Sequence, residues 1–186
     1  TGMSLPGYLG MLRDSGLDTL PGTAAEILDD DVRFVLSRNK LSTRQWREVI
    51  ITAHRCGIRS TSTLMYGHVE TPQHWVNQLQ LFRRIQAETG GFTEFIPLPF
   101  VHMASPIYLQ RKSRRGPTFR ETVLMHAVGR IAYHGLIDNV QVSWVKIGVS
   151  GAVQLLQSGW PSSLQAASSP RSVSVPPVGR RASTWR

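Results

Sequence analysis

Segments that favour strands and helices alternate along most of this chain, and that order limits the folds available to it. Strand-forming residues begin near Leu17, Ile58, Phe92 and Asn139, and apolar residues at helical spacing follow each of them. Strict alternation predicts a parallel sheet with crossover helices. Polar residues after the strands favour a (β/α) barrel, whose site is built by the loops that follow the strands. Four βα units are visible where a full barrel has eight, so we predict an α/β fold of about half a TIM-type barrel over residues 1–157.

Capping and turn residues predict where these elements begin and end. The T-x-x-E spacing of Thr23 and Glu26 predicts a capping box that opens a helix reaching Val35, and similar patterns occur at Ser42–Gln45 and Thr118–Glu121. Gly90 is expected to end a helix that begins after Thr71. The expected strands are residues 17–20, 58–65, 92–98 and 139–147, and the expected long loop is 101–116.

The last segment differs in character from the rest. Residues 158–186 contain eight Ser, four Pro and four Arg, with no acidic residue and no helical or strand period. This composition predicts a disordered tail. Because the barrel pattern is lost abruptly, one hypothesis for this tail is a frameshift or a misread 3′ end.

A net charge of +9 raises the question of nucleic-acid binding. Much of the excess lies in the tail and in a loop cluster of Arg111, Lys112, Arg114 and Arg115. No aromatic residues interleave with these charges and no nucleic-acid motif is present, so solvated charge is the preferred interpretation. A basic nucleic-acid-binding module, or an inactive half-barrel, is kept as an alternative.

Other classes are limited by single features. The sequence contains no run of about 18 apolar residues, so no membrane span is predicted. Residues 1–12 lack the pattern of a signal peptide, and a cytoplasmic location is expected. Cys56 is the one cysteine, which excludes an internal disulfide, and the histidines have no ligand-like spacing, so no metal site is predicted.

Four sequence blocks together resemble the second module of the radical SAM FO synthase family, and the resemblance spans about residues 1–157. The blocks are GLDTLPGTAAEIL (16–28), STLMYGHVET (62–71), GGFTEFIPLPF (90–100) and SWVKIG (143–148). The resemblance implies a radical SAM barrel that uses S-adenosyl-L-methionine (SAM) and a 4Fe-4S cluster. It also implies transfer of a 4-hydroxybenzyl group from L-tyrosine to 5-amino-6-ribitylaminouracil, in partnership with the other module or subunit of the enzyme. The radical SAM enzymes of the futalosine route to menaquinone share this layout and are the alternative.

The family's CxxxCxxC cluster motif is absent from this chain, and one thiolate cannot hold a cluster that expects three. The expected parent is therefore a transferase, of which this chain alone would be an inactive fragment. By resemblance, Thr63, Met65, Gly67 and Glu70 occupy the strand-end positions that meet SAM in radical SAM barrels.

Five further residues are candidates for a substrate pocket. Glu26 follows the first strand, His68 lies in the loop after the second, and Glu94 lies within the third, where alternation turns it into the barrel. Ser143 and Lys146 are expected on the fourth strand, with Lys146 placed to meet an anionic group. Each has a structural alternative, such as a capping box for Glu26 or a buried ion pair for Glu94.

Overall fold

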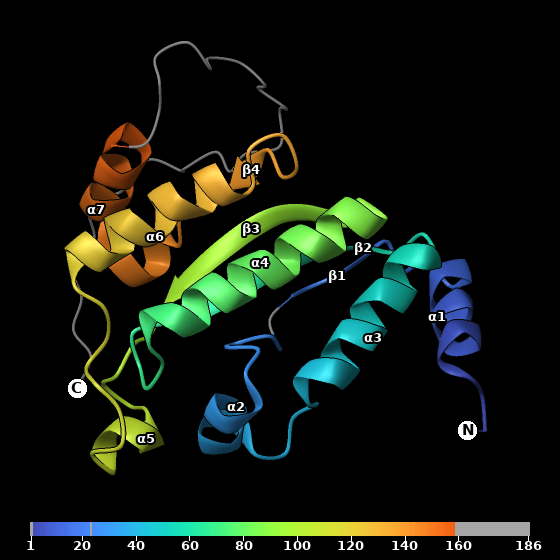
Figure 1. The fold of residues 1–186 in the computed structure, drawn as a ribbon, viewed down its shortest axis with the longest axis horizontal. Coiled ribbons are helices and arrows are strands. Elements are labelled where there is room, and N and C mark those ends of the chain that lie inside the picture. Colours follow the sequence, from blue (N-terminus) through green and yellow to red (C-terminus); the bar gives the residue numbers. More distant parts are fainter. Residues whose placement is uncertain (1, 23, 159–186) are drawn as a thin grey trace, which may run out of the picture.

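The structure is a computed structural model that describes residues 2–22 and 24–158. Within those ranges the chain alternates helices with four strands (Figure 1). The elements are α1 (Leu5–Asp14), β1 (Thr19–Leu20), α2 (Asp30–Ser37), α3 (Thr43–Arg55), β2 (Arg59–Tyr66), α4 (Pro72–Thr89), β3 (Phe92–Pro99), α5 (Pro106–Leu109), α6 (Phe119–Ala132), β4 (Asn139–Val140) and α7 (Trp144–Ser158). None of the helices in the described ranges is long and apolar enough to span a bilayer.

The four strands form one parallel sheet in the order β1-β2-β3-β4. Thr19 is in register with Arg59, Thr63 with Ile96 and Phe95 with Val140. β2 and β3 have eight residues each, whereas β1 and β4 have two. The predicted parallel α/β fold is confirmed, and an open sheet whose strands neighbour one another in chain order is compatible with part of a barrel.

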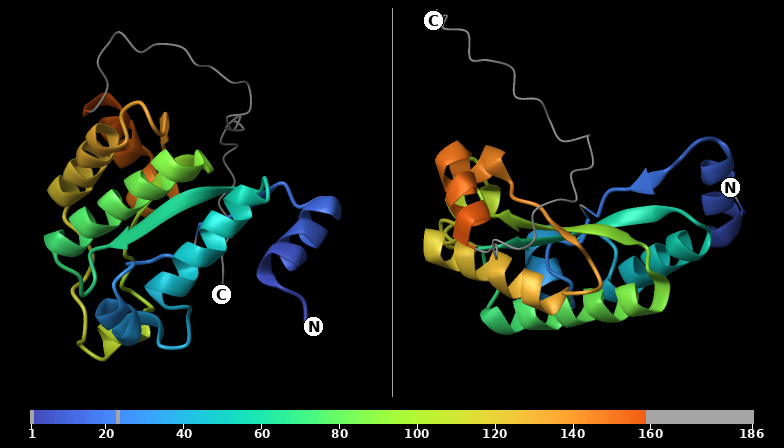
Figure 2. Two further views of the ribbon diagram at one scale, coloured as in Figure 1. Left: turned by 45° about the vertical axis from the view of Figure 1, so that its right-hand side comes forward. Right: turned by 90° about the horizontal axis from the view of Figure 1, so that it is seen from above.

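Helices α3, α4 and α6 lie along one face of this sheet (Figures 1 and 2). The main core fills the space between the two layers, where Leu64, Tyr66, Phe82 and Phe95 are fully buried. Apolar residues at i, i+3, i+4 positions bury one face of α3 and of α4 against the sheet. A smaller cluster joins α1 to α3 and to the start of β2 through Leu9, Ala53 and Ile58.

Several predicted helix boundaries are confirmed. Ser42 and Gln45 form a capping box at α3, and Thr118 and Glu121 form one at α6. α4 ends at Gly90, whose φ of 62° lies in the left-handed region that glycine adopts without strain.

Three expectations about local structure are wrong. The helix expected from Thr23 begins instead at Asp30, because Asp29 accepts from the Val32 N–H and caps it, and Glu26 lies in the preceding loop. The loop expected over 101–116 contains the short helix α5. The strand expected over 139–147 ends at Val140, and the residues from Trp144 onward form α7, which is interrupted by a kink at Gly148. The predicted disordered tail begins at Ser158, which the structure places at the end of α7, and the rest of that segment lies outside the described residues.

Candidate functional site at the carboxyl ends of the strands

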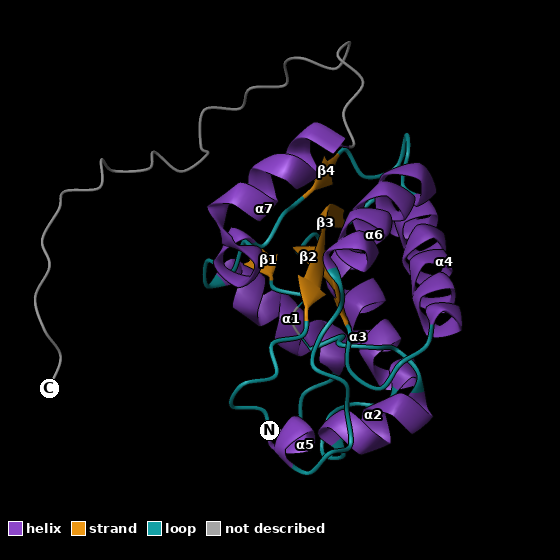
Figure 3. Cartoon of the chain, turned by 90° about the vertical axis from the view of Figure 1, so that its left-hand side faces the viewer, coloured by secondary structure: helices purple, strands orange, loops and turns teal. Residues whose placement is uncertain are grey.

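The carboxyl ends of the four strands point toward the end of the molecule that carries α2 and α5 (Figure 3). The loops at this edge hold Glu26 after β1 and Gly67, His68 and Glu70 after β2, and Lys146 follows β4 in the first turn of α7. In a parallel α/β sheet, ligands bind at this edge because the loops there are free to vary. The structure therefore brings most of the predicted site residues to one end of the sheet.

Glu70 is the best-connected of these residues. Its carboxylate accepts hydrogen bonds from the Gly67 N–H at 2.5 Å, the His68 N–H at 2.8 Å and the Trp75 indole N–H at 3.0 Å. The side chain has no solvent-exposed surface. A buried carboxylate is tolerable when such donors replace water. Glu70 thus closes the β2–α4 loop, and no ligand can contact it without movement of that loop.

The electrostatics of this loop keep Glu70 ionised. Burial alone would raise the pKa of the Glu70 carboxyl, but hydrogen bonds from His68 and from the Gly67 and His68 backbone outweigh it and hold the pKa at about 2. The His68 ring is also buried, with Nε2 3.0 Å from the Met65 carbonyl oxygen and Nδ1 2.9 Å from Glu70 Oε2. Because a carbonyl only accepts, Nε2 carries a proton. These contacts position the loop, and a role for His68 or Glu70 toward a ligand stays a prediction.

Gly67 holds two strand-end loops together. Its φ is 97°, and a Cβ at this position would lie 2.2 Å from Pro117 Cδ. The loop that carries Pro117 is also tied to Glu70, since Arg114 lies 3.8 Å from Glu70 Oε1 and donates to Glu121 at 2.7 Å. Space beside Gly67 is therefore filled by the chain itself, which explains the glycine without a ligand.

Thr63 and Met65 lie on β2 and bond to the loop after β1. The Thr63 hydroxyl donates to the Gly22 carbonyl, and the Met65 N–H donates to the Glu26 carbonyl at 3.0 Å. Thr63 is buried and Met65 is partly exposed. The hydrogen bonds continue the β1–β2 pairing beyond the two residues of β1, so these positions extend the sheet toward its carboxyl edge.

Glu26 occupies a strained position in the same loop. Its φ is 39°, which is uncommon for a residue with a side chain. Lys40 Nζ lies 2.5 Å from Glu26 Oε1, and the buried Arg33 guanidinium lies 3.9 Å from Oε2. Oε2 is buried with no hydrogen-bond partner among the described residues. Glu26 thus faces two cations rather than the capping partner predicted for it.

Sequence reasoning missed two buried polar residues that shape this loop. Gln78 on α4 accepts from the Leu28 N–H at 2.7 Å and donates to the carbonyls of Thr63 at 3.1 Å and Glu26 at 3.2 Å. Arg33 on α2 donates to several backbone carbonyls of residues 24–27 and to that of Leu41. The available signal was a polar residue on the apolar face of a predicted helix. Gln78 lies on that face, three residues after Trp75 and four before Phe82.

Glu94 and Ser143 do not join the other candidates. Glu94 is paired in register with Asn139, and its carboxylate accepts from the Gln141 amide, which ties the segment after β4 to β3. Ser143 was placed on a strand, and this is corrected: it precedes α7 and its carbonyl accepts from the Lys146 N–H at 3.0 Å. The strand alternation predicted for Ser143 and Lys146 therefore does not exist.

Lys146 still reaches the carboxyl edge, from the first turn of α7. Its Nζ donates to the carbonyl of Pro99, the last residue of β3, at 3.1 Å, and partial burial lowers the pKa of the ammonium group. It lines a depression of about 210 Å³ between the end of β3, the loop at Arg115–Pro117 and the starts of α6 and α7. This depression is a concave feature at the edge where the strands end.

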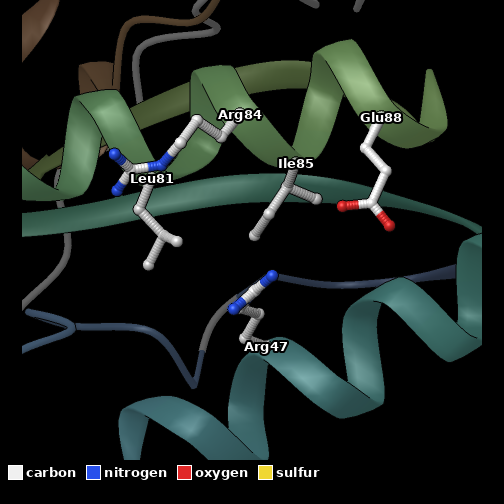
Figure 4. A pocket seen from close by; sticks show the side chains of 5 residues that line it. All are labelled: Arg47, Leu81, Arg84, Ile85 and Glu88. Carbon is white, nitrogen blue, oxygen red and sulfur yellow. The ribbon is translucent and has the colours of Figure 1, made fainter.

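A second cavity, of about 310 Å³, lies between α3 and α4 (Figure 4). In Figure 4 the Arg47 side chain rises from α3 toward Ile85 and the Glu88 carboxylate points down from α4. Its lining residues come from the covering helices and none comes from a strand end. We therefore place the candidate site at the carboxyl edge.

The described residues contain no group of three or more His, Cys, Asp or Glu side chains that could hold a metal ion. Cys56 caps the end of α3, and its Sγ lies 3.9 Å from the Pro6 carbonyl. The residues present therefore do not fit a cluster that takes three protein thiolates.

No protein-family model matches the chain. Direct comparison finds relatives named FO synthase: one from Nocardia farcinica is 57% identical over 158 residues, and one from Mycobacterium tuberculosis is 54% identical over 159. These alignments cover 85% and 86% of this chain but 18% and 19% of the relatives. The chain thus spans less than a fifth of the length of those two proteins.

A shorter relative gives the same picture. The 5-amino-6-(D-ribitylamino)uracil–L-tyrosine 4-hydroxyphenyl transferase of Methanothermobacter thermautotrophicus is 52% identical over 151 residues, which are 81% of this chain and 41% of that protein. Identity above 50% over most of the chain, with proteins of both names, confirms the resemblance drawn from the four sequence blocks. The chain is therefore a relative of one segment of FO synthase and of the separate tyrosine hydroxyphenyl transferase.

Proposed function

We propose that this chain is a segment of a radical SAM transferase that moves a 4-hydroxybenzyl group from L-tyrosine to 5-amino-6-ribitylaminouracil in FO biosynthesis. The observation that carries the proposal is the identity of 52% with a transferase whose name states both substrates. In this proposal residues 1–157 form part of the barrel and residues 158–186 a tail. The enzyme acts in the cytoplasm, and the other module or subunit of FO synthase is its partner.

The parallel sheet and its carboxyl edge support this assignment. β1, β2 and β3 end at one edge, and the loops after β1 and β2 are held by buried backbone N–H groups that donate to Gln78 and Glu70. Loops fixed in this way can hold a substrate in one orientation, which is how a protein directs a reactive cofactor. The segment would supply part of a substrate wall, with Glu26 and Lys146 as its charged members.

The cofactors fit this segment unequally. SAM, when bound, would supply the radical that starts the reaction. Glu70 is fully buried and the Thr63 hydroxyl is committed to Gly22, so neither side chain is free to bind SAM in this conformation. These residues instead fix the edge against which the cofactor would lie. We assign no ligand of the 4Fe-4S cluster to this chain.

A chimeric enzyme tests the proposal. Residues 2–158 of this chain replace the aligned segment in the Nocardia farcinica FO synthase, and FO is measured after reconstitution with iron, sulfide and SAM. We expect a chimera that forms FO from L-tyrosine and 5-amino-6-ribitylaminouracil. A matched chimera with Glu26→Gln and one with Lys112→Met separate an effect at the strand ends from a change of surface charge.

The result that would overturn the proposal is a folded, cluster-loaded chimera that forms no FO. The same preparation is assayed with the substrates of the futalosine-pathway enzymes. Activity there would move the segment to that alternative, and the chromatographic profile of each product distinguishes the two.

A further inference from the structure

The depression beside Lys146 has an unusual combination of charge and apolar surface. Lys146 and Arg115 are the charged residues that line it, and no acidic residue is among the lining residues. The buried Phe100 and the half-exposed Phe119 are the aromatic residues that line it. Two cations beside apolar walls suit a small organic anion better than a cation or a neutral polar molecule.

Neither cation is neutralised by the protein. The described residues give Lys146 one partner, the Pro99 carbonyl at 3.1 Å, and an ammonium group has three protons to donate. Arg115 forms no ion pair with a carboxylate within the described residues, whereas the neighbouring Arg114 is committed to Glu121 at 2.7 Å. Glu121 is the acidic residue nearest to Arg115 in the sequence, and its carboxylate already accepts from Arg114 and from the Thr118 N–H, each at 2.7 Å. Donors on Lys146 and Arg115 therefore remain for a ligand.

The position of the depression favours an anion as well. α6 begins at Phe119, so the positive end of its backbone dipole lies at the rim. Lys146 is an exposed residue whose partial burial lowers the pKa of its ammonium group, so its charge is only partly desolvated. A partly desolvated cation gains more from an anionic partner than a fully hydrated one does, because less of the interaction is screened by water.

We propose that Lys146 and Arg115 bind the carboxylate of an amino-acid ligand, with its apolar part against Phe100 and Phe119. A cavity of about 210 Å³ is below the usual range for a whole ligand site, so it holds one end of the molecule. The choice of ligand rests on the proposed function, whose two amino-acid reactants are L-tyrosine and the methionine part of SAM. Both present the same carboxylate, and the experiment separates them.

Binding to the full chain is measured first, by ¹H–¹⁵N NMR titration with two pairs of compounds. Each pair differs in the carboxylate: L-tyrosine against tyramine, and SAM against decarboxylated SAM. We expect one acid to shift the Gly116 and Ile147 resonances and its decarboxylated analogue to bind about ten- to a hundredfold more weakly. Equal binding within both pairs would overturn the proposal.

Variants then locate the carboxylate. Lys146→Met and Arg115→Gln should each weaken the acid without affecting its analogue, and Lys146→Arg should retain binding. Lys112→Met and Arg84→Gln make the same changes of charge outside the depression and should leave binding unchanged. An equal loss in Lys112→Met and Lys146→Met would overturn the site.

The chimera provides a second reading when the chain alone is not stable. Lys146→Met in the chimera should raise the KM for one amino-acid reactant about ten- to a hundredfold and leave the KM for 5-amino-6-ribitylaminouracil unchanged. An active chimera with unchanged KM values would overturn the carboxylate site alone. An inactive chimera, with carboxylate-dependent binding retained by the chain, would overturn the proposed function alone.

Discussion

The indole of Trp75 donates to the carboxylate of Glu70 at 3.0 Å, so the first turn of α4 holds the residue that closes the loop before it. Strand β2, its loop and the helix that covers it are thereby joined at one fully buried acid. Glu70 thus links the elements at the carboxyl edge, and replacing its carboxylate should mainly lower the stability of the fold.

Glu70→Gln tests this role. A glutamine amide has one acceptor oxygen, and its NH₂ group would face a backbone N–H or the indole, so at least one buried donor loses its partner. Each unsatisfied donor costs about 1–3 kcal/mol, and urea denaturation should show a loss of at least that size. Glu88→Gln, which removes an exposed ion pair with Arg55, should cost about 1 kcal/mol or less. Equal losses in the two variants would contradict the role assigned to Glu70.

The free energy of unfolding should decrease in two successive ranges as the pH is lowered. Burial, with a smaller effect from Arg59, lowers the pKa of His54 to about 4 from an ordinary value of 6.5. Between these two values His54 is protonated in the unfolded chain and neutral in the folded chain. Stability is therefore lost as the pH falls from about 6.5 to 4. Glu70, with its pKa at about 2, adds a loss as the pH falls below its ordinary value of 4.5.

His54→Gln separates the two ranges. Because burial also lowers the pKa of His126, the variant should reduce rather than abolish the pH dependence of the urea midpoint between pH 6.5 and 4, while leaving the lower range intact. His134→Gln, at an exposed position, is the control and should keep the original profile. A His54→Gln profile as steep as the original between pH 6.5 and 4 would assign that loss to another group.

Gly67→Ala should destabilise the protein through both backbone strain and collision. The φ of 97° is unfavourable for alanine, and the new methyl group would meet Pro117. Backbone strain alone costs about 1–2 kcal/mol, to which the displacement of the Pro117 loop is added. Gly10→Ala in α1 is the matched control: a Cβ there meets no atom within 4 Å, and the change should stabilise the protein by about 0.5–1 kcal/mol. Thermal unfolding should show a lower melting temperature for Gly67→Ala and a higher one for Gly10→Ala.

Gln78→Leu should loosen the loop after β1. The substitution leaves the Leu28 N–H and the carbonyls of Thr63 and Glu26 without their buried partner. We expect a loss of about 2–4 kcal/mol in urea denaturation, together with faster amide hydrogen exchange at Leu28. Gln73→Leu, on the exposed start of the same helix, should change stability by less than about 0.5 kcal/mol. Unchanged exchange at Leu28 would contradict the bridging role.

The regular elements could be predicted because their signals are local. The capping boxes at Ser42 and Thr118 and the left-handed stop at Gly90 are set by residues within one turn of each other. The structure of the segment after Val140 could not be predicted, since its residue pattern fits a strand as well as a helix. Its backbone instead forms turn hydrogen bonds, such as Lys146 N–H to Ser143 O at 3.0 Å. Periodicity alone does not decide such short segments.

The candidate site was predicted in position but not in contacts. Glu26, Gly67, Glu70 and Lys146 all lie near strand ends, as the order of elements required. What each side chain touches depends on residues far away in sequence, such as Pro117 for Gly67 and Pro99 for Lys146. Long-range partners of this kind leave no pattern in the sequence around either residue.

Each strand of this sheet lies beside the strand that precedes it in the chain. A newly made βα unit can therefore dock against structure that has already left the ribosome, without waiting for residues still to be synthesised. Parallel pairing is slow when its partners are distant, and adjacent order keeps each loop closure short. The same order that arranges the strand ends also suits the sheet to growth from its N-terminal edge during translation.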